Sequence, residues 1–361
     1  MEGGASELKL INEGAFGCIF YPGINCSGRK ESPNYITKIQ KGSKMIQNEI
    51  AISEKIRAIK GFTKYFAPIL KQCPVKITKS KVKDIQKCEV FRKMSESEIK
   101  RSTYVSNKIR YVGTQDLKHY IFNELNTAHT ISHFYVTYLY LLNGLKNLAD
   151  HKIIHYDIKP NNIMYDKKLE IPIIIDFGLS IDMHKLSAHT YRNAFYVYDT
   201  YTYWCIDIMM CNYIFQVITY ERSHKLTVTK EELDTIYDDF MYSVDRKSTP
   251  DNDVFNIGIK PIDTTHRKRY DAYFERFLHK SWFSMYEHLI HFHPTWDNYS
   301  LAISYLVMLD DIHMEKPDIF SEKDHQFAEL LSKIVYAMPN ERPSISDTIK
   351  QVKKLFMRSR L

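Results

Sequence analysis

Two short polar loops, each next to an apolar run, most constrain what this chain can fold into. The first, "HYDIKPNNIMYD" at 155–166, brings Asp157, Lys159 and Asn162 together within six residues. In the second, "IIIDFGLS", an apolar strand-like run leads to Asp176, and Gly178 allows the chain to turn away sharply. A carboxylate at the end of a buried strand is costly unless it binds a cation. The two loops therefore indicate one chemical site rather than two unrelated turns.

The side chains of these loops favour phosphoryl transfer. The carboxylate of Asp157 can hold a hydroxyl nucleophile, and the ammonium of Lys159 can meet the transferred phosphoryl group. Oxygen atoms of the kind that Asn162 and Asp176 carry are the ligands that Mg²⁺ prefers. We therefore predict that Asp157 and Lys159 are catalytic and that Asn162 and Asp176 bind the metal.

A glycine pair near the N-terminus could hold a phosphate. In "INEGAFGCIF", at 11–20, Gly14 and Gly17 lie between two strand-like runs. Without a Cβ atom, a turn can bring its backbone N–H groups against a phosphate. The same spacing also fits a tight hairpin with no ligand, so this stretch alone leaves both readings open.

A lysine and a glutamate further along the chain form a second candidate pair. Lys38 lies in the predicted strand 34–40, where an inward ammonium is costly unless it meets an anion. Glu49 lies in a predicted helix over 44–59, and a Lys38–Glu49 pair would aim the ammonium at a phosphate. Glu54 is the competing partner on another helix face, and two unrelated surface charges are the plain alternative.

Residue periodicity predicts strands in the first third of the chain and mostly helices after residue 125. We expect short strands at 88–94 and 107–112 and a solvated, lysine-rich connection over 71–87. A long helix should end near Asp150, and a helix should start at Thr229, where Glu232 completes a capping box.

Composition narrows the class of protein. The chain has 361 residues and a formal net charge of +7, which is too weak and too dispersed to indicate nucleic-acid binding. Six cysteines without a C-x-x-C pair are expected to be reduced thiols of an intracellular, cytoplasmic protein. Neither a secretory signal nor a membrane span is predicted.

The two loops resemble the H-R-D-x-K-x-x-N and D-F-G motifs of the eukaryotic-type protein kinase superfamily. The likeness continues in "TWDNYSLAISYLVML", where Asp297 matches an anchoring aspartate, and in "MPNERPSI", where Arg342 matches an arginine that pairs with an acidic residue, here Asp207. The resemblance implies an α+β, bilobal protein-kinase-like fold. A small β-rich N-lobe would cover 1–112 and a larger α-helical C-lobe 113–361, with an insertion at about 212–294.

The resemblance also implies ATP and Mg²⁺ as cofactors and a protein with Ser/Thr hydroxyls as substrate. Lys38 would grip the α- and β-phosphates, with Glu49 as its partner, and Tyr111 would lie in the hinge beside the adenine. The residues implied to cover the nucleotide from the glycine-rich loop are Ile11, Asn12, Glu13, Gly14, Ala15, Phe16, Gly17, Cys18 and Ile19.

Some positions depart from the family pattern. Tyr156 replaces the arginine that usually receives a phosphorylated residue, so we expect activity without phosphorylation of the activation segment. "DTYTYWCID" can be laid on G-T-x-x-Y-x-A-P-E, with Thr200 on the threonine, but its proline is missing. A pseudokinase scaffold is therefore the alternative function, and a small-molecule kinase is a third. The divergent motifs are similar to those of kinases encoded by large DNA viruses. Neither the protein substrate nor the oligomeric state can be read from the sequence.

Overall fold

The computed structural model describes residues 9–14, 17–27, 29–41, 44–77, 82–123, 127–195, 197–245 and 264–357. The chain forms two compact units. The first, called here the strand-rich unit, comprises residues up to Gln115 together with Met164–Leu179. The second, called here the helical unit, comprises Asp116–Ile163 and Ser180–Leu361.

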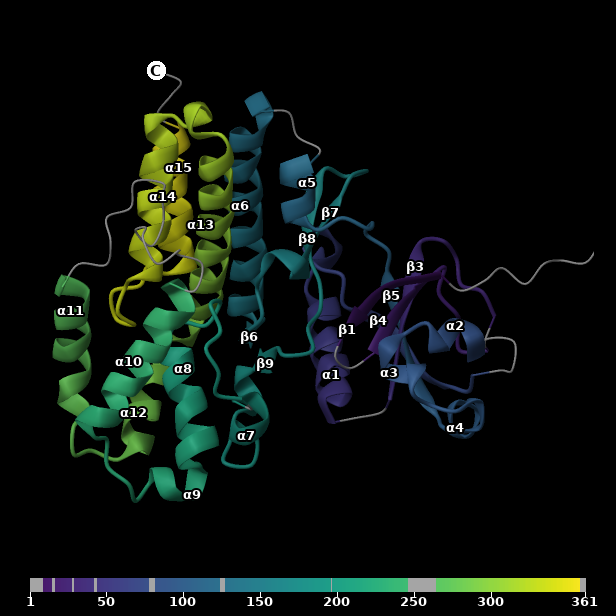
Figure 1. Cartoon of the computed structure of the whole chain (residues 1–361), viewed down its shortest axis with the longest axis horizontal. Helices are drawn as coiled ribbons and strands as arrows, with labels where there is room; N and C mark the ends of the chain where they lie inside the picture. Colours follow the sequence, from purple (N-terminus) through teal and green to yellow (C-terminus); the bar gives the residue numbers. More distant parts are fainter. Residues whose placement is uncertain are drawn as a thin grey trace, which may run out of the picture. The chain divides into compact units, whose positions relative to one another are not determined.

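A five-stranded antiparallel sheet, in the order β1-β2-β3-β5-β4, organises the strand-rich unit (Figure 1). Its alternation decides which side chains share a face. Cys18 and Phe20 of β2 are buried in one apolar cluster, whereas Ile19 points to the opposite face, where it lies directly across from Lys38 of β3. The strands are β1 (Lys9–Gly14), β2 (Gly17–Tyr21), β3 (Tyr35–Lys41), β4 (Ile69–Val75) and β5 (Tyr104–Arg110).

Helix α1 (Lys44–Ala58) follows β3 as predicted, and it contacts β4. The buried positions Ile46, Glu49, Ile52 and Ile56 recur at helical spacing and form its inner stripe, and buried Ile59 follows the end of the helix. A carboxylate in the middle of an apolar stripe requires a partner. Glu49, unlike the exposed Glu54, is therefore placed to meet a cation.

Three short helices occupy the segment between β4 and β5, where two predictions were wrong. Residues 88–94 were expected to form a strand but contain helix α3 (Glu89–Arg92), and the expected connection over 71–87 contains most of β4 and helix α2 (Val82–Gln86). Helix α4 (Glu96–Arg101) completes the segment. Ile85, Cys88, Phe91 and Ile99 of this segment pack on the cluster that contains Cys18 and Phe20. The helices therefore cover the sheet face that does not carry Lys38.

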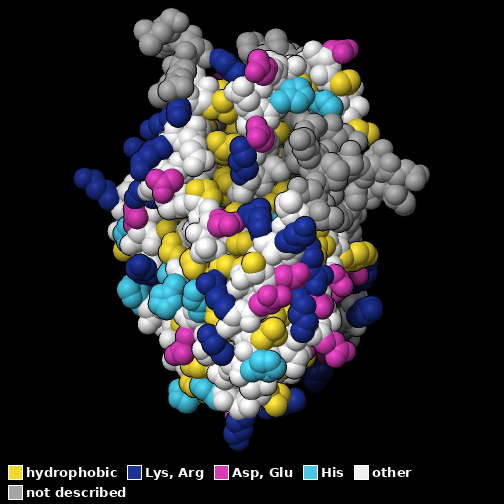
Figure 2. Space-filling view, turned by 90° about the vertical axis from the view of Figure 1, so that its left-hand side faces the viewer, with side chains coloured by type: hydrophobic (Ala, Val, Ile, Leu, Met, Phe, Trp, Pro, Cys, Tyr) yellow, Lys and Arg dark blue, Asp and Glu magenta, His cyan; other side chains and the backbone are white. Residues whose placement is uncertain are grey.

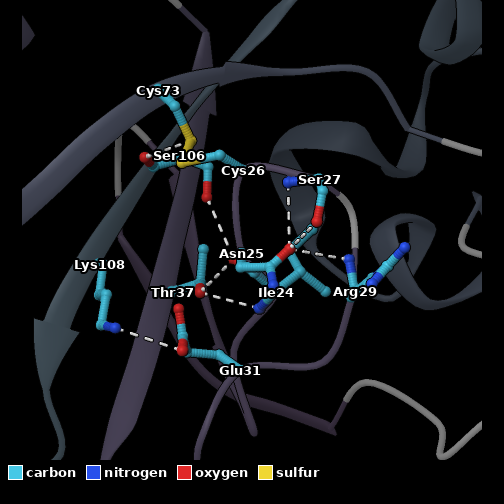
Figure 3. Close-up of a disulfide and its surroundings, with 10 residues drawn as sticks. All are labelled: Ile24, Asn25, Cys26, Ser27, Arg29, Glu31, Thr37, Cys73, Ser106 and Lys108. Carbon is cyan, nitrogen blue, oxygen red and sulfur yellow. Dashed lines mark hydrogen bonds and ion pairs between the residues drawn. A yellow bond between two sulfur atoms is a disulfide. The ribbon is translucent and has the colours of Figure 1, made fainter.

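Two disulfides in the strand-rich unit correct the prediction of reduced thiols. Cys18 of β2 is bonded to Cys88, and Cys26 is bonded to Cys73 of β4. Figure 3 shows the second bond beside Asn25, whose side-chain oxygen accepts hydrogen bonds from the backbone of Ser27 and Arg29. Cys205 and Cys211 are buried free thiols whose pKa is raised by burial, so the prediction holds for these two.

A second small sheet in the strand-rich unit pairs β7 (Ile163–Asp166) with β8 (Ile171–Ile174). The end of β8 is fixed by the chain that follows α1: the N–H of Ile174 donates to the oxygen of Tyr65 at 2.8 Å, and the N–H of Ala67 donates to the oxygen of Ile174 at 3.0 Å. This strand leads directly to Asp176 and thereby sets its position within the unit.

The helical unit is built around helix α13 (Trp296–Glu315), which is buried along almost its whole length. A helix that is buried on all sides lies at the centre of its domain. Helices α6 (Thr127–Asp150) and α14 (Glu322–Val335) pack directly on α13, and α15 (Ile345–Met357) packs on both of them (Figure 1). The predicted long helix, which was to end near Asp150, is thus confirmed.

Further elements complete the helical unit. The helix predicted to start at Thr229 is α10 (Lys230–Asp245), and the N–H of Glu232 donates to the Thr229 hydroxyl. Part of the predicted insertion, 246–263, lies outside the described residues. The other elements include α5 (Leu117–Asn123), β6 (Ile153–Ile154), a 3₁₀ turn (Pro160–Asn162), β9 (Ile181–Asp182), α7 (Tyr191–Ala194), α8 (Ile206–Tyr213), a π-helical turn (Ile214–Ile218), α9 (Tyr220–Ser223), α11 (Thr264–Phe274) and α12 (Trp282–Leu289).

Charges of both signs mix on the surface. On the face shown in Figure 2, the basic and acidic side chains of the described residues are interspersed. Ion pairs also join the two signs within single helices, as Lys230 with Asp234 on α10 and Arg267 with Asp271 on α11 show. Among the helices of the described ranges, none combines the length and the apolar character that crossing a membrane requires.

Candidate active site

Lys38, Glu49 and Asp176 form a charge cluster in the strand-rich unit. The ammonium of Lys38 lies 3.3 Å from Glu49 Oε2 and 3.4 Å from Asp176 Oδ1. The side chains of Lys38 and Glu49 are only 13% and 6% exposed, whereas that of Asp176 is 47% exposed. The predicted Lys38–Glu49 pair is thus present, and a more accessible carboxylate stands at its open side.

Electrostatics keep Lys38 charged. Burial by itself would lower the pKa of Lys38, but the charges and hydrogen bonds of Asp176 and Glu49 outweigh it, so the pKa lies above its ordinary value. Burial raises the pKa of Glu49, and the charge of Asp176 adds to this, while Lys38 opposes it. One ammonium is therefore shared between two carboxylates, and the more exposed of the two, Asp176, is the one that a metal cation could reach.

The backbone presents the Asp176 carboxylate outward. Asp176 has φ of 60°, the left-handed conformation that few residues other than glycine adopt, and its Oδ1 accepts the N–H of Gly178 at 3.3 Å. The ring of Phe177 is buried edge-on against Phe66, 6.1 Å between centroids. Such strain persists where the surroundings enforce it, and it clusters at functional sites.

The glycine-rich stretch forms a hairpin between β1 and β2, in which Gly14 pairs with Gly17. A Cβ at Gly17 would lie 2.5 Å from the oxygen of Ile39, so only glycine lets β2 approach β3 this closely. Asn12 lies in β1 and accepts the N–H of Glu13 at 2.8 Å. Ala15 and Phe16, at the predicted phosphate-binding tip, lie outside the described residues.

The side chains predicted to cover the nucleotide from this hairpin divide between the two faces of the sheet. Ile19 lies on the face of Lys38, whereas the Cys18 side chain is buried on the other face in its disulfide. Glu13 accepts the N–H of Glu89 at 2.8 Å, and Ile11 precedes it in β1. The hairpin is thus held to the helical segment between β4 and β5 by one covalent and one hydrogen bond.

Tyr111, the predicted hinge residue, directly follows β5. Its N–H donates to the oxygen of Asn34 at 2.9 Å, and its ring stacks on Tyr21 at 4.3 Å between centroids. Burial raises the pKa of Tyr111. The backbone at the end of β5 is thereby fixed to the start of β3.

Asp157, Lys159 and Asn162 form a second cluster, in the helical unit. Asn162 Nδ2 donates to Asp157 Oδ2 at 2.8 Å and to the Asp157 backbone oxygen at 2.9 Å, and Lys159 Nζ lies 3.0 Å from Asp157 Oδ2. Both of these Asn162 bonds use the amide nitrogen, so neither occupies the amide oxygen, the atom that the predicted metal would need. The three predicted residues are brought together.

A buried aspartate of α13 holds this loop. Asp297 accepts the N–H groups of His155 at 2.7 Å and of Tyr156 at 3.0 Å, as the resemblance implied. Burial raises the pKa of Asp297, and the His155 charge and these two donors oppose that rise. The loop that carries Asp157 is therefore anchored to α13, the helix that is buried along almost its whole length.

Tyr156 has a structural role where the family has an arginine. Its ring is 1% exposed and lies near Trp204 and Trp296, its hydroxyl donates to Asn212 Oδ1 at 3.0 Å, and its φ is 70°. Trp204 Nε1 donates to the Tyr156 oxygen at 3.0 Å. Together with the bonds to Asp297, these contacts fix the loop without any phosphorylated residue.

The predicted Asp207–Arg342 pair is confirmed. Arg342 Nη2 lies 2.7 Å from Asp207 Oδ1, and both side chains are fully buried. Arg342 also donates to Thr295 Oγ1 at 3.0 Å, and Trp296 Nε1 donates to Asp207. This pair joins α8 to the chain between α14 and α15.

Sequence reasoning missed one residue of the Asp157 cluster. The hydroxyl of Tyr201 donates to Asp157 Oδ1 at 2.5 Å. Thr200, the expected match to the family threonine, donates its backbone N–H to Asp199 Oδ1 at 2.7 Å. Residues 198–203 contain three tyrosines and two threonines. Their spacing alone does not show which of these hydroxyl groups contacts Asp157.

Both clusters fit the cofactor that the sequence implied. Asp176 offers a half-exposed carboxylate, and Asn162 offers an amide oxygen. These are hard oxygen ligands, which suit Mg²⁺. That the strand-rich cluster and the Asp157 cluster meet around one metal–nucleotide complex stays a prediction.

Comparison with known proteins agrees with these features. A family model described as "Protein kinase domain" matches residues 70–353, a span that contains Asp157, Asn162 and Asp176 and begins after Lys38 and Glu49. A 93-residue segment is 37% identical to mitogen-activated protein kinase kinase kinase 1b of Physcomitrium patens, covering 22% of this chain and 12% of that relative. A 49-residue segment is 43% identical to the membrane-associated tyrosine- and threonine-specific cdc2-inhibitory kinase of Drosophila melanogaster, covering 14% and 9%. The matched segments thus span only about a tenth of these curated relatives.

Proposed function

The chain belongs to the protein kinase family, and from this membership we propose that it transfers the γ-phosphoryl group of ATP to serine and threonine hydroxyls of proteins. The observation that carries the proposal is the arrangement around Asp157. One carboxylate has an ammonium at 3.0 Å and an amide at 2.8 Å, on a loop anchored to the central helix α13. A scaffold that only binds partners has no need to hold a carboxylate in this way.

In the helical unit, Asp157 would orient the acceptor hydroxyl and take its proton. The ammonium of Lys159 would offset charge that builds on the transferred group. Asn162 both fixes Asp157 and offers its amide oxygen to the metal. The rigid attachment of this loop to Asp297 means that little reorganisation is needed during the reaction, which is the basis of electrostatic catalysis.

In the strand-rich unit, Lys38 would bind the α- and β-phosphates, and Glu49 would keep its ammonium oriented. Asp176 would hold the metal from the same cluster. Mg²⁺, when bound, neutralises charge on the phosphate oxygens. The hairpin at Gly14 and Gly17 would cover the phosphates with backbone N–H groups, and the chain at Tyr111 would lie beside the adenine.

The choice of serine and threonine rests on Lys159. A lysine two residues after the catalytic aspartate resembles serine/threonine kinases rather than tyrosine kinases. The Drosophila relative is named for both tyrosine and threonine, so the acceptor needs its own test.

The test is transfer of label from γ-labelled ATP with Mg²⁺ to a generic protein acceptor, followed by phosphoamino-acid analysis. We expect phosphoserine and phosphothreonine on the acceptor, and none with the Lys38→Met variant. If the protein binds Mg·ATP but labels no acceptor, it is a pseudokinase. If it labels only small alcohols or amino sugars, it is a small-molecule kinase.

A further inference from the structure

One carboxylate and two sulfur atoms lie close together on the sheet face that does not carry Lys38. A carboxylate oxygen of Glu13 and the Sγ atoms of Cys18 and Cys88 all lie within 4.8 Å of one another. Among the residues that the structure describes, this is the one group of three or more carboxylate, imidazole or thiol side chains with metal-ligand spacing. Thiolate sulfur and carboxylate oxygen are both zinc ligands in proteins.

The backbone holds the three side chains in register. Glu13 of β1 lies directly across from Cys18 of β2, so the two side chains share a face. Glu13 Oε2 accepts the N–H of Glu89 at 2.8 Å, and the N–H of Cys88 donates to the oxygen of Ile85 at 3.1 Å. A carboxylate has several lone pairs, so the bond to Glu89 orients Glu13 and still leaves it able to bind a metal.

We propose that Glu13, Cys18 and Cys88 bind a zinc ion when the disulfide between the two cysteines is reduced. Thiolate ligands select zinc over magnesium and calcium. Tetrahedral zinc has Zn–S bonds of about 2.3 Å and Zn–O bonds of about 2.0–2.2 Å, so the two sulfur atoms would separate to about 3.8 Å. Both cysteines are buried and Glu13 is exposed, which places a water molecule as the fourth ligand on the Glu13 side.

The reaction that opens the site balances in two steps. A phosphine reductant donates two electrons to the disulfide and becomes a phosphine oxide, with its oxygen and the two thiol protons supplied by one water molecule. Zinc then binds the two sulfur atoms as thiolates and releases both protons to solvent. The inference does not depend on phosphoryl transfer, because no step uses ATP or Asp157.

The zinc ion would preserve the link that reduction removes. In the oxidised protein, the disulfide joins β2, immediately after Gly17, to the residue before α3. In the reduced protein, zinc would join the same two residues and add Glu13 of β1. The hairpin of β1 and β2 would therefore stay attached to the helical segment between β4 and β5 in both redox states.

The Cys26–Cys73 pair is a matched control in the same unit. It is also a disulfide, but among the described residues no carboxylate, imidazole or further thiol completes a metal-binding group with it. Glu31, the carboxylate drawn in Figure 3, pairs with Lys108 at 3.2 Å instead. Zinc sites in proteins have three or four protein ligands, so reduction of this pair should create no site.

The experiment adds Co²⁺, a spectroscopic substitute for zinc, to the full chain reduced with a phosphine, and then displaces it with Zn²⁺. We expect a single cobalt ion per chain, with thiolate-to-cobalt charge-transfer absorption and the visible bands of tetrahedral cobalt. Cys88→Ser should abolish these bands, and Cys73→Ser should retain them. Glu13→Gln, which keeps both thiols, should weaken zinc binding by about tenfold or more.

Two controls make the result decisive. The unreduced protein, in which Cys205 and Cys211 are the free thiols, should give no charge-transfer band. Melting temperatures of the reduced, metal-free proteins verify that each variant folds, and zinc should raise the melting temperature of the wild type but not of Cys88→Ser.

Three outcomes would overturn the inference, and none of them bears on the proposed function. A folded, fully reduced wild-type chain that gives no charge-transfer band has no such site. Bands that are lost with Cys73→Ser and kept with Cys88→Ser would place the metal on the other pair. Zinc affinity of Glu13→Gln equal to that of the wild type would remove the carboxylate from the site.

Discussion

The two units each contain a buried arginine or lysine paired with carboxylates, and the two pairs are built differently. Arg342 and Asp207 of the helical unit are fully buried and joined by two hydrogen bonds, at 2.7 and 3.3 Å. Lys38 of the strand-rich unit makes longer contacts, at 3.3 and 3.4 Å, and Asp176 beside it is 47% exposed. The first pair is closed to solvent, whereas the second keeps an open side.

This difference suits the Arg342–Asp207 pair to a structural role and the Lys38 cluster to ligand binding. A fully buried bidentate pair cannot exchange partners without unfolding its surroundings, so Arg342 and Asp207 hold the fold. The ammonium of Lys38 is shared between two carboxylates at long distances, so a phosphate can replace part of these contacts and a metal can bind the Asp176 carboxylate. The units differ in chemistry as well. Both disulfides lie in the strand-rich unit, and all 15 histidines fall in the sequence of the helical unit.

The largest expected effect comes from reduction, which acts on one unit only. The disulfides close loops with sequence separations of 70 and 47 residues. In the chain-entropy model each stabilises the fold by about 4 kcal/mol. Dithiothreitol should therefore accelerate hydrogen exchange of the sheet amides and leave α13 protected. The control is a thiol titration of the denatured, unreduced protein. It should find two free thiols, and six would contradict the disulfides.

The Arg342→Ala substitution should cost about 3–5 kcal/mol of unfolding free energy, because it leaves the Asp207 charge buried without its cation. Denaturant unfolding measures this. Arg269→Ala is the matched control, since its pair with Glu341 is exposed and should be worth about 0–1 kcal/mol. Equal losses in the two variants would mean that the buried pair has no special structural role.

The Lys38→Met substitution, unlike Arg342→Ala, should affect activity more than stability. We expect kcat to fall by about 10²–10³-fold, the usual loss when one preorganised charge contact is removed. The melting temperature should change less than with Arg342→Ala, since Glu49, whose pKa is already raised, can take up a proton when its partner is gone. Lys108→Met on β5, which removes an ion pair with Glu31, serves as the control and should retain activity. Full activity of Lys38→Met would remove Lys38 from the site.

Mild acid should destabilise the helical unit, with the smallest effect of the four. Burial lowers the pKa of His288 and of His293 below the ordinary value. The unfolded chain therefore binds protons more readily than the folded one, and stability falls as pH drops through about 6.5. Hydrogen exchange at pH 7.5 and 5.5 should show weaker protection in α12, and His293→Gln should reduce that change. An equal loss in the sheet, whose unit contains no histidine, would exclude this cause.

The sequence predicted best the residues whose chemistry demands a fixed spacing. Asp157, Lys159 and Asn162 were identified because one short loop carries all three, and the ion pair of Asp207 with Arg342 followed from matching the family's motifs. Lys38 and Glu49 were paired correctly because Glu49 lies in the apolar stripe of α1 and Glu54 does not.

What the sequence missed depends on tertiary structure. Cysteine spacing does not encode the disulfide partner, so Cys18 and Cys26 were taken as free. The short apolar run that became α3 fits either a helix or a strand by periodicity. Strand β4 was obscured by its polar residues and by Pro74, which an edge strand tolerates. The hydrogen bond from Tyr201 to Asp157 depends on the path of the loop that carries Tyr201, and no local sequence pattern specifies that path.

The most direct test of the account compares the wild-type protein with Asp157→Asn in phosphoryl transfer to a protein acceptor and in Mg·ATP binding. The account predicts that kcat falls by about 10²–10⁴-fold, the range for loss of a general base, while nucleotide affinity and melting temperature stay close to wild type. Equal transfer rates in the two proteins, at a rate above background, would contradict the role of Asp157 on which the proposed function depends.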